Sequence, residues 1–289
     1  MALHYVERAA PPPLAAAIEC VWSVSDRVAR SARPPDRVIP DGRPELIVHR
    51  GGRYHRVVGG RLVRQPAAFL AGTLSRPWLV QAPPRVATIG VRFRPGGLTA
   101  LFGASLAGTA DREVPLSGMP APVTALVAAL VAAIRGARGP ASALRAAEAW
   151  LLAHAAAHFP GGAVPAPACA GVVRVIHRRR GRLGVEALAT AVGLPRRRLE
   201  RLFRRETALS PKQYIRIVRL TALLERLDAP DRDRLIDVAL DAGYFDQAHI
   251  ARDFKTLTER RATGRRGDDG ELAVHFTRPD RLLRLLAAE

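Results

Sequence analysis

Cysteine is scarce in this 289-residue chain, which holds only Cys20 and Cys169. Two cysteines provide no disulfide framework, and neither is part of a Cys-x-x-Cys pair that could bind zinc. We therefore expect two free, buried thiols. The sequence also lacks a phosphate-binding Gly-Lys-Ser/Thr loop and the Gly-x-Ser-x-Gly turn of a serine hydrolase. Asp41 and Glu45 flank a turn and make a poor catalytic pair, so we predict no catalytic residue, cofactor or metal.

Long apolar runs are missing as well. The nearest approach, residues 123–134, is rich in alanine and shorter than the roughly 18 residues that a membrane-spanning helix needs. The N-terminus also lacks a basic segment followed by an apolar core, which is the pattern of a secretory signal peptide. These absences predict a soluble, cytoplasmic protein without a membrane partner.

Lysine is almost absent, with Lys212 and Lys255 the only two, so arginine carries the positive charge. The formal net charge is +19, which favours an anionic partner such as nucleic acid or an acidic membrane surface. Arginine, alanine, glycine and proline are all abundant, a bias that a GC-rich genome would also produce. The local excess is more informative, because residues 196–219 hold nine basic residues against Glu200 and Glu206.

A short amphipathic helix is predicted over residues 185–192, where apolar residues recur every three or four positions. Gly193 permits the positive φ that ends it, and Pro195 suits the first turn of a second helix over residues 196–205. The inward positions of this second helix are Leu199, Leu202 and Phe203. Its arginines must therefore face outward, an arrangement that suits the DNA major groove.

The same pattern recurs nearer the C-terminus. Residues 235–242 are predicted to form another short amphipathic helix, residues 243–245 turn the chain, and Asp246 can cap a helix over residues 247–255. The inward residues of that helix are Ile250 and Phe254. The chain therefore holds two helix-turn-helix units in tandem.

A longer helix over residues 210–227 joins the two units, with Ser210 as its cap and Pro211 at its first position. Two such units around a Ser-Pro-led helix resemble the DNA-binding domain of the AraC family of bacterial transcription regulators. The residues that carry the resemblance are Leu188, Ala189, Gly193, Leu194, Phe203, Ser210, Pro211, Tyr214, Arg219, Leu220, Ala239, Gly243, Tyr244, Asp246, Gln247, Phe254 and Lys255.

The resemblance implies one DNA-reading helix in each unit, so the outward residues of the two helices become candidate contacts. The base-reading candidates are Arg197, Glu200 and Arg201 on the first helix and Gln247, Ala248, His249 and Arg252 on the second. The phosphate-contact candidates are Arg196, Arg198, Arg204, Arg205 and Lys255. Arginine can grip guanine with two hydrogen bonds, glutamine can pair with adenine, and glutamate can accept from the amino group of cytosine.

Two features depart from the family pattern. Ala208 stands where the family usually has glycine after the first reading helix, which costs little if the local φ is negative. After Thr258 the expected glycine and Pro-led closing helix are replaced by an arginine-rich stretch. Residues 265–270 are predicted to be disordered, and residues 281–288 to form a terminal helix.

Residues 1–119 are predicted to form short strands separated by turns, a spacing typical of a small β-barrel or sandwich. The strand candidates are residues 21–24, 45–49, 54–58, 68–71, 78–81 and 86–93, with short helices near residues 14–20 and 98–102. Motifs such as Ile39-Pro-Asp-Gly42 make residues 5–118 similar to the N-terminal domain of a branch of uncharacterised AraC-type regulators. That resemblance implies a sensory or oligomerising domain and names no ligand.

These patterns divide the chain into five segments. They are a β-rich regulatory domain (1–119), a helical pair packed on it or at a dimer interface (120–159), a linker (160–168), the AraC-type DNA-binding domain (169–262) and a divergent, partly disordered tail (263–289). Further helices are expected over residues 122–135, 141–158 and 171–180. The predicted fold class is α+β, with a barrel- or sandwich-like N-terminal domain and an all-α C-terminal domain.

Two pairs of side chains have a spacing that could bind a ligand. His154 and His158 lie four residues apart on one helix face, a zinc-binding spacing, but no third ligand accompanies them and surface histidines are the better interpretation. Arg92 and Arg94 alternate along a strand and could grip a carboxylate or phosphate effector. Such a pair more often lies on a solvated sheet face, and both interpretations stay open.

The sequence as a whole predicts a sequence-specific regulator of transcription that binds duplex DNA and is not an enzyme. Its N-terminal domain would sense an effector or mediate self-association, as a monomer or homodimer. The expected partners are double-stranded DNA, an unidentified small molecule and, as a further candidate, RNA polymerase. Two alternatives remain: a non-specific architectural DNA-binding protein, and a DNA-alkylation repair enzyme, which would need an activated cysteine.

Overall fold

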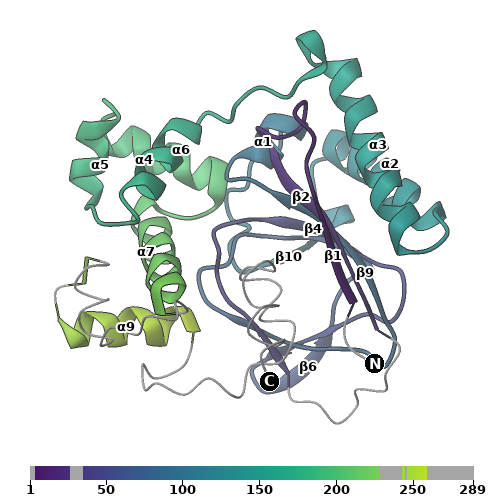
Figure 1. Cartoon of the computed structure of the whole chain (residues 1–289), viewed down its shortest axis with the longest axis horizontal. Coiled ribbons are helices and arrows are strands. Elements are labelled where there is room, and N and C mark those ends of the chain that lie inside the picture. The colour runs from purple at the N-terminus through teal and green to yellow at the C-terminus, as the bar shows by residue number, and fades with distance from the viewer. Residues whose placement is uncertain (1–3, 27–34, 228–242, 245, 259–289) are drawn as a thin grey trace.

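The computed structural model describes residues 4–26, 35–227, 243–244 and 246–258 of the chain. Its N-terminal part consists of antiparallel sheets and helices, and its C-terminal part is helical, so the α+β fold class is confirmed (Figure 1). The helix predicted over residues 235–242, the disorder predicted for 265–270 and the terminal helix predicted over 281–288 lie outside the described residues.

The strands form two antiparallel sheets, one of six strands in the order β1-β2-β9-β4-β7-β10 and one of four in the order β3-β8-β5-β6. Their bounds are β1 His4–Ala9, β2 Ile18–Asp26, β3 Asp36–Val38, β4 Glu45–His49, β5 His55–Val58, β6 Arg61–Arg64, β7 Ala68–Ala71, β8 Trp78–Gln81, β9 Val86–Phe93 and β10 Glu113–Pro115. All the strand candidates are confirmed. The sequence missed β1, β3, β6 and β10. Most residues of β1 and β6 are exposed, and exposed strands lack the alternation of apolar and polar residues. Strands β3 and β10 are only three residues long.

The four inner strands of the six-stranded sheet, β2, β9, β4 and β7, are buried on both faces, and alternate residues of a strand point to opposite sides. On one face, Leu46 and Val48 join the core that includes residues of helices α2 (Ala121–Gly136) and α3 (Pro140–His158). On the other face, Trp22 and Phe69 pack against residues of the four-stranded sheet. A Cβ atom at Gly90 would lie 2.1 Å from the Trp22 indole, so this position must be glycine for Trp22 to lie across the sheet.

The helix predicted near residues 14–20 is wrong. Residues 11–17 form hydrogen-bonded turns, in which the amide of Ile18 donates to the carbonyl of Leu14, and strand β2 begins at Ile18. Ile18 pairs with Phe93 of β9, a partner far away in the sequence. This pairing overrides the helical spacing of the apolar residues. The other short helix is confirmed as α1 (Gly97–Phe102).

The C-terminal part packs its described helices around one apolar core that includes Leu188, Leu199, Phe203 and Tyr214. The helices are α4 Ala170–Arg178, α5 Val185–Ala191, α6 Arg196–Thr207, α7 Pro211–Leu227 and α9 Gln247–Thr258, and single 3-10 turns occur at Leu116–Gly118 and Pro160–Gly162. Figure 1 shows α4 to α7 on the opposite side of the sheets from α2 and α3. The helices predicted for this region are confirmed wherever the structure describes them.

The predicted caps of two helices are present. The hydroxyl oxygen of Ser210 accepts a hydrogen bond from the amide of Gln213 at 3.3 Å, and the side-chain oxygen of Gln213 accepts from the amide of Ser210 at 2.9 Å. This reciprocal pair is a capping box at the start of α7. A side-chain oxygen of Asp246 accepts from the amide of His249 at 2.5 Å and caps α9.

Ala208 follows α6 with a φ of +63°. The condition under which alanine would cost little here, a negative φ, is therefore not met. A side chain with a Cβ atom is strained in this left-handed region, so the departure from glycine has a stability cost.

Among the residues that the structure describes, no helix is long and apolar enough to cross a membrane. Cys20 and Cys169 are free and buried, as predicted.

Candidate nucleic-acid interface and internal pocket

Helix α6 is amphipathic, and its apolar side anchors it in the C-terminal core. Leu199 and Phe203 are fully buried, and Phe203 packs edge-on against Tyr214 of α7 with ring centroids 5.6 Å apart. The opposite side of the helix is exposed and carries the basic residues. The orientation predicted for this helix is therefore confirmed.

Four exposed arginines of α6 have neither an ion pair nor a hydrogen bond through their side chains within the described part of the chain. They are Arg197, Arg198, Arg201 and Arg204. Arg197, Arg201 and Arg204 follow one another at intervals of four and three residues, so their side chains lie on one face of the helix. A helix face with unpaired guanidinium groups can bind both phosphates and guanine edges.

The two other arginines of α6 are paired. Arg196 donates to Glu186 of α5 at 2.6 Å and to Glu200 at 3.1 Å, and its hydrogen bonds with Glu200 and Glu186 raise the pKa of its guanidinium. Arg205 lies 2.8 Å from the buried carboxylate of Glu206. Glu200 would therefore have to exchange its bond with Arg196 before it could accept from a cytosine.

Helix α9 presents fewer basic groups than α6. Its exposed candidates are Ala248, Arg252 and Lys255. His249 is half-buried, with its ring 5.0 Å from that of Tyr244 and its Nε2 3.4 Å from Nη1 of Arg219. Gln247 is the first residue of the helix. Of these candidates, His249 thus lies toward the protein and not toward a ligand.

Helix α7 supports both α6 and α9. Its Tyr214 packs on α6, and its Arg216 donates to the buried carboxylate of Asp253 in α9 at 2.7 Å. Arg219 donates to the carbonyl of Gly181, ahead of α5, through two nitrogens at 3.0 and 2.8 Å. Because these contacts all start from one helix, α7 holds α6 and α9 at a set separation.

Comparison with known families agrees with this arrangement. Residues 188–266 match a family described as a helix-turn-helix domain. The chain carries an AraC-type helix-turn-helix domain. It is a DNA-binding transcription regulator. Residues 6–115, ahead of the AraC-type domain, match a domain of unknown function, DUF6597, and no curated protein matches the chain.

Several solved structures resemble the chain that carries this AraC-type domain. ToxT from Vibrio cholerae O395 is 8% identical, with a TM-score of 0.43 over 84% of this chain and 95% of ToxT. Wild-type ToxT from Vibrio cholerae strain SCE256, bound to an unsaturated fatty acid, is 9% identical, with a TM-score of 0.41 over 90% and 92%. The AraC-like transcriptional activator CuxR is 21% identical, with a TM-score of 0.25 over 70% and 73%. At these values the neighbours leave the effector and the target of this chain open.

A pocket of about 70 Å³ lies between the two sheets, ahead of the AraC-type domain. Most of its lining is apolar, and Glu45 and His49 lie at opposite ends of β4 within it. No sequence pattern had indicated this pocket. The available signal was the polar residues Glu45 and His49, which with Ile47 occupy every second position of a buried strand and so share one face.

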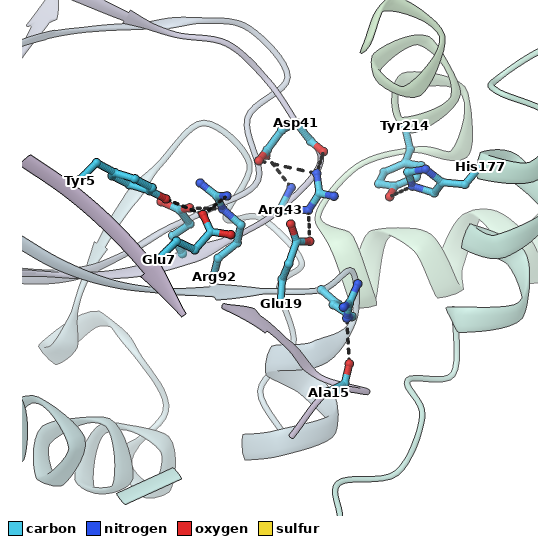
Figure 2. Close-up of polar contacts among 11 residues, drawn as sticks. Tyr5, Glu7, Ala15, Glu19, Asp41, Arg43, Arg92, His177 and Tyr214 are labelled. Atoms are coloured by element: carbon cyan, nitrogen blue, oxygen red, sulfur yellow. Dashed lines mark hydrogen bonds and ion pairs between the residues drawn. The ribbon is translucent and has the colours of Figure 1, made fainter. Parts of the chain in front are cut away.

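Arg92, one of the two effector candidates, is buried inside the sheet. Its Nε donates to Glu45 at 2.6 Å, its Nη1 lies 3.8 Å from Glu7, and only 4% of its side chain is exposed (Figure 2). Arg94 lies beyond the end of β9, is exposed, and donates to the carbonyl of Ala15 at 2.8 Å. The prediction that the two share one strand face is wrong, whether as an anion grip or as a solvated surface, because β9 ends between them and carboxylates hold Arg92 inward.

Arg43 lies between the pocket and the AraC-type domain. It forms an ion pair with Glu19, and its Nη1 lies 3.8 Å from the Asp41 carboxylate. It lines both the pocket and a hollow of about 280 Å³ that Tyr214 also lines. Figure 2 shows Arg43 on the side of the ion-pair network nearest to Tyr214, whose hydroxyl lies 3.0 Å from Nε2 of His177.

Burial disfavours charge on the pocket's carboxyl groups. It raises the pKa of Asp41 and the pKa of Glu45, although Arg43 and Arg92 act in the opposite direction. Burial also lowers the pKa of His49 to about 4. The His49 ring, which lies 3.2 Å from the side-chain oxygen of Gln65, is therefore neutral at neutral pH.

Of the pair His154 and His158, His158 is exposed, as the favoured surface interpretation requires, whereas His154 departs from it. His154 is buried, and its Nε2 lies 3.2 Å from the carbonyl oxygen of Leu101. Nδ1 of His158 lies 2.9 Å from the carbonyl oxygen of His154. Across the ranges that the structure describes, no group of three or more His, Cys, Asp or Glu side chains could hold a metal ion.

Proposed function

We propose that the AraC-type domain binds two segments of one DNA duplex, with α6 in one major groove and α9 in the next. The observation that carries this proposal is the set of four unpaired arginines on α6, opposite a fully buried apolar face. The buried face fixes the orientation of the helix, so the four arginines are held together on its solvent side. A short basic helix held in this way suits the major groove.

Contacts to bases and contacts to phosphates are assigned to different arginines of α6. Arg197 and Arg201 are the proposed base contacts, because residues near the start of a reading helix meet base edges. Arg198 and Arg204 are the proposed phosphate contacts, since a phosphate needs only a free cation within reach. Arg252 is the proposed base contact of α9.

The paired and peripheral basic residues take a smaller part in the proposal. Arg196 and Arg205 are already bonded to carboxylates, so each would gain less from a phosphate than a free arginine. Lys255 is exposed in the last turn of α9 and is kept as a phosphate candidate. Glu200, Gln247 and Ala248 stay base-reading candidates, and the half-buried His249 is dropped.

The N-terminal part is proposed to control DNA binding, either through an effector or through self-association. Its backbone is bonded to the end of α6: the amide of Leu106 donates to the carbonyl of Arg205 at 2.8 Å, and the amide of Gly96 donates to the carbonyl of Glu206 at 3.1 Å. A change in the N-terminal part can therefore reach the reading helix directly. This supports, at a named contact, the regulatory role that the sequence predicts.

The alkylation-repair alternative is disfavoured by the state of the cysteines. Burial raises the pKa of Cys20, and it raises the pKa of Cys169 to about 12. The Cys169 thiol also donates to the carbonyl of Pro95 at 3.3 Å. An alkyl-accepting cysteine needs the opposite, a lowered pKa and access to solvent.

The test is the base preference of matched variants on a selected duplex. Arg201→Ala should lose about 1–3 kcal/mol at one segment only, and Arg252→Ala should lose a similar amount at the other. Arg145→Ala is the control, because it removes an exposed arginine from α3 with the same change in charge. If both test variants lose preference at the same bases, the two-segment arrangement is wrong. A wild-type protein that binds random duplex equally well would favour the architectural alternative.

A further inference from the structure

The pocket between the sheets combines apolar walls with carboxylates at one end. Trp22, Trp78 and Val80 contribute to the apolar lining. Asp41 and Glu45 are part of the same lining. An apolar pocket with a few charged groups is typical of a site for a small molecule, and the charged groups decide which molecules fit.

The sign of the charge at this end of the pocket is negative. The lining contains two carboxylates and one guanidinium, that of Arg43. Arg43 is already engaged by Glu19 as well as by Asp41. Arg92 is not part of the lining, because Glu45 and Glu7 hold it inside the sheet. An anionic ligand would therefore face two carboxylates, and the two nearby guanidiniums are already ion-paired, Arg43 with Glu19 and Arg92 with Glu45. A cationic ligand would face no such repulsion.

The walls favour the same sign of ligand. The faces of tryptophan rings attract cations, and both Trp22 and Trp78 line the pocket. The volume of about 70 Å³ corresponds to roughly five to seven water-sized groups. This is the size of a small alkyl amine, and benzylammonium is at the upper limit of what fits, since a cavity of about 150 Å³ holds benzene.

We propose that this pocket binds a small apolar cation of the protonated-amine class at Asp41 and Glu45, and that its occupancy is transmitted to α6 through Arg43 and Tyr214. The inference rests on the proposed function, because it gives the effector a chemical class and a route to the DNA-reading helix. Its sign is opposite to that of the anion which Arg92 and Arg94 could have held in one of the two interpretations of the sequence.

The route to α6 consists of direct contacts. A cation at Asp41 competes with Arg43 for the same carboxylate, so Arg43 shifts toward Glu19 and the hollow that it shares with Tyr214. Gly42, which has a φ of +80°, lies so close to Tyr214 that an added Cβ would be 2.7 Å from the ring. A movement of residues 41–43 toward α7 would therefore press on the ring of Tyr214, and Tyr214 packs on Phe203 of α6.

Three ligands of similar size and different charge test the chemical class: benzylammonium, benzyl alcohol and benzoate. Their binding to the full-length protein at pH 7.5 is measured by calorimetry. Benzylammonium should bind at least tenfold more tightly than benzoate, with benzyl alcohol between them. Benzoate binding as tightly as benzylammonium, or no detectable binding of benzylammonium, would overturn the proposal.

Variants of the lining locate the site. Asp41→Asn should weaken benzylammonium about tenfold and leave benzyl alcohol within twofold, whereas Glu148→Gln on α3 is the control and should change neither. Ala71→Val narrows the pocket and should weaken both ligands, which keeps the location testable if Asp41→Asn fails to fold. Unchanged benzylammonium binding in Ala71→Val would place the ligand elsewhere and overturn the site.

The route is tested by measuring DNA affinity with and without saturating benzylammonium. Salt alone weakens DNA binding, so the sample without benzylammonium receives ammonium chloride to the same ionic strength. The wild-type dissociation constant should change more than threefold, and Arg43→Gln should bind benzylammonium without that change. An unchanged wild-type DNA affinity would overturn the route. Specific DNA binding without any amine binding would overturn this inference alone, whereas loss of specific DNA binding would overturn the proposed function.

Discussion

At the residue scale, strand β4 places two buried polar side chains, Glu45 and His49, in the lining of the pocket between the sheets. The sequence predicted a strand over residues 45–49, and in the structure Glu45, Ile47 and His49 all line the pocket. It could not predict that Arg92 would be the partner of Glu45, because the two lie 47 residues apart and meet only through the pairing of β4 with β9. The strand was a local property of the sequence, and its register was not.

His49 makes stability depend on pH. Its pKa is lowered by burial to about 4, so the unfolded chain binds the proton first and stability falls as the pH drops below about 6.5. The expected loss at this site is about 2 kcal/mol between pH 7.5 and pH 5. Between the same two pH values, the free energy of unfolding of His49→Gln should fall by about 2 kcal/mol less than that of the wild type. The measurement is urea unfolding at both pH values. Equal losses in the two proteins would show that His49 takes its proton normally.

Ala208 offers a stabilising substitution. The left-handed conformation costs an alanine roughly 1–2 kcal/mol, while the extra freedom of glycine in the unfolded chain returns roughly half of that. Ala208→Gly should therefore raise the free energy of unfolding by about 1 kcal/mol. Ala137 follows α2 with a φ of −72°, so Ala137→Gly is the matched control and should be destabilising. A loss of stability in Ala208→Gly would rule out strain at this position.

At the element scale, the helices of the AraC-type domain were predictable because their signals are local. The apolar spacing, the Ser210 cap and Gly193 all lie within or beside the helices that they define. The pairing of Arg196 with Glu186 was not predictable, since it crosses the turn between α5 and α6. The sequence therefore could not separate the free arginines of α6 from the paired ones.

The salt dependence of DNA binding tests whether a free arginine of α6 contacts phosphate. Each phosphate contact contributes about −0.9 to the slope of log affinity against log salt. Arg204→Ala should make the slope shallower by about one unit on every duplex, and Arg145→Ala on α3 should leave it unchanged. The measurement is fluorescence anisotropy at salt concentrations from about 50 to about 300 mM, over which log affinity falls linearly with log salt concentration. A slope that Arg204→Ala does not alter would assign Arg204 to solvent.

At the scale of the whole molecule, the sequence predicted which parts the chain contains but not how they meet. The contacts between the sheets and the AraC-type domain join residues that lie far apart in the sequence: Leu106 with Arg205, Gly96 with Glu206, and Arg37 with the carbonyl of Thr258 at 2.9 Å. Such contacts depend on tertiary packing, and no local pattern encodes them. They also make the N-terminal part a structural neighbour of both α6 and α9.

The most direct test of the account is selection of bound sites from random duplexes by the full-length protein. Two reading helices held by α7 should select two short blocks of sequence whose centres lie about one helical turn, roughly ten base pairs, apart. Insertion of about five base pairs between the blocks, half a turn, should then abolish tight binding, because α6 and α9 would face opposite sides of the duplex. Selection of a single block, or equal affinity for the spaced and unspaced sites, would contradict the account.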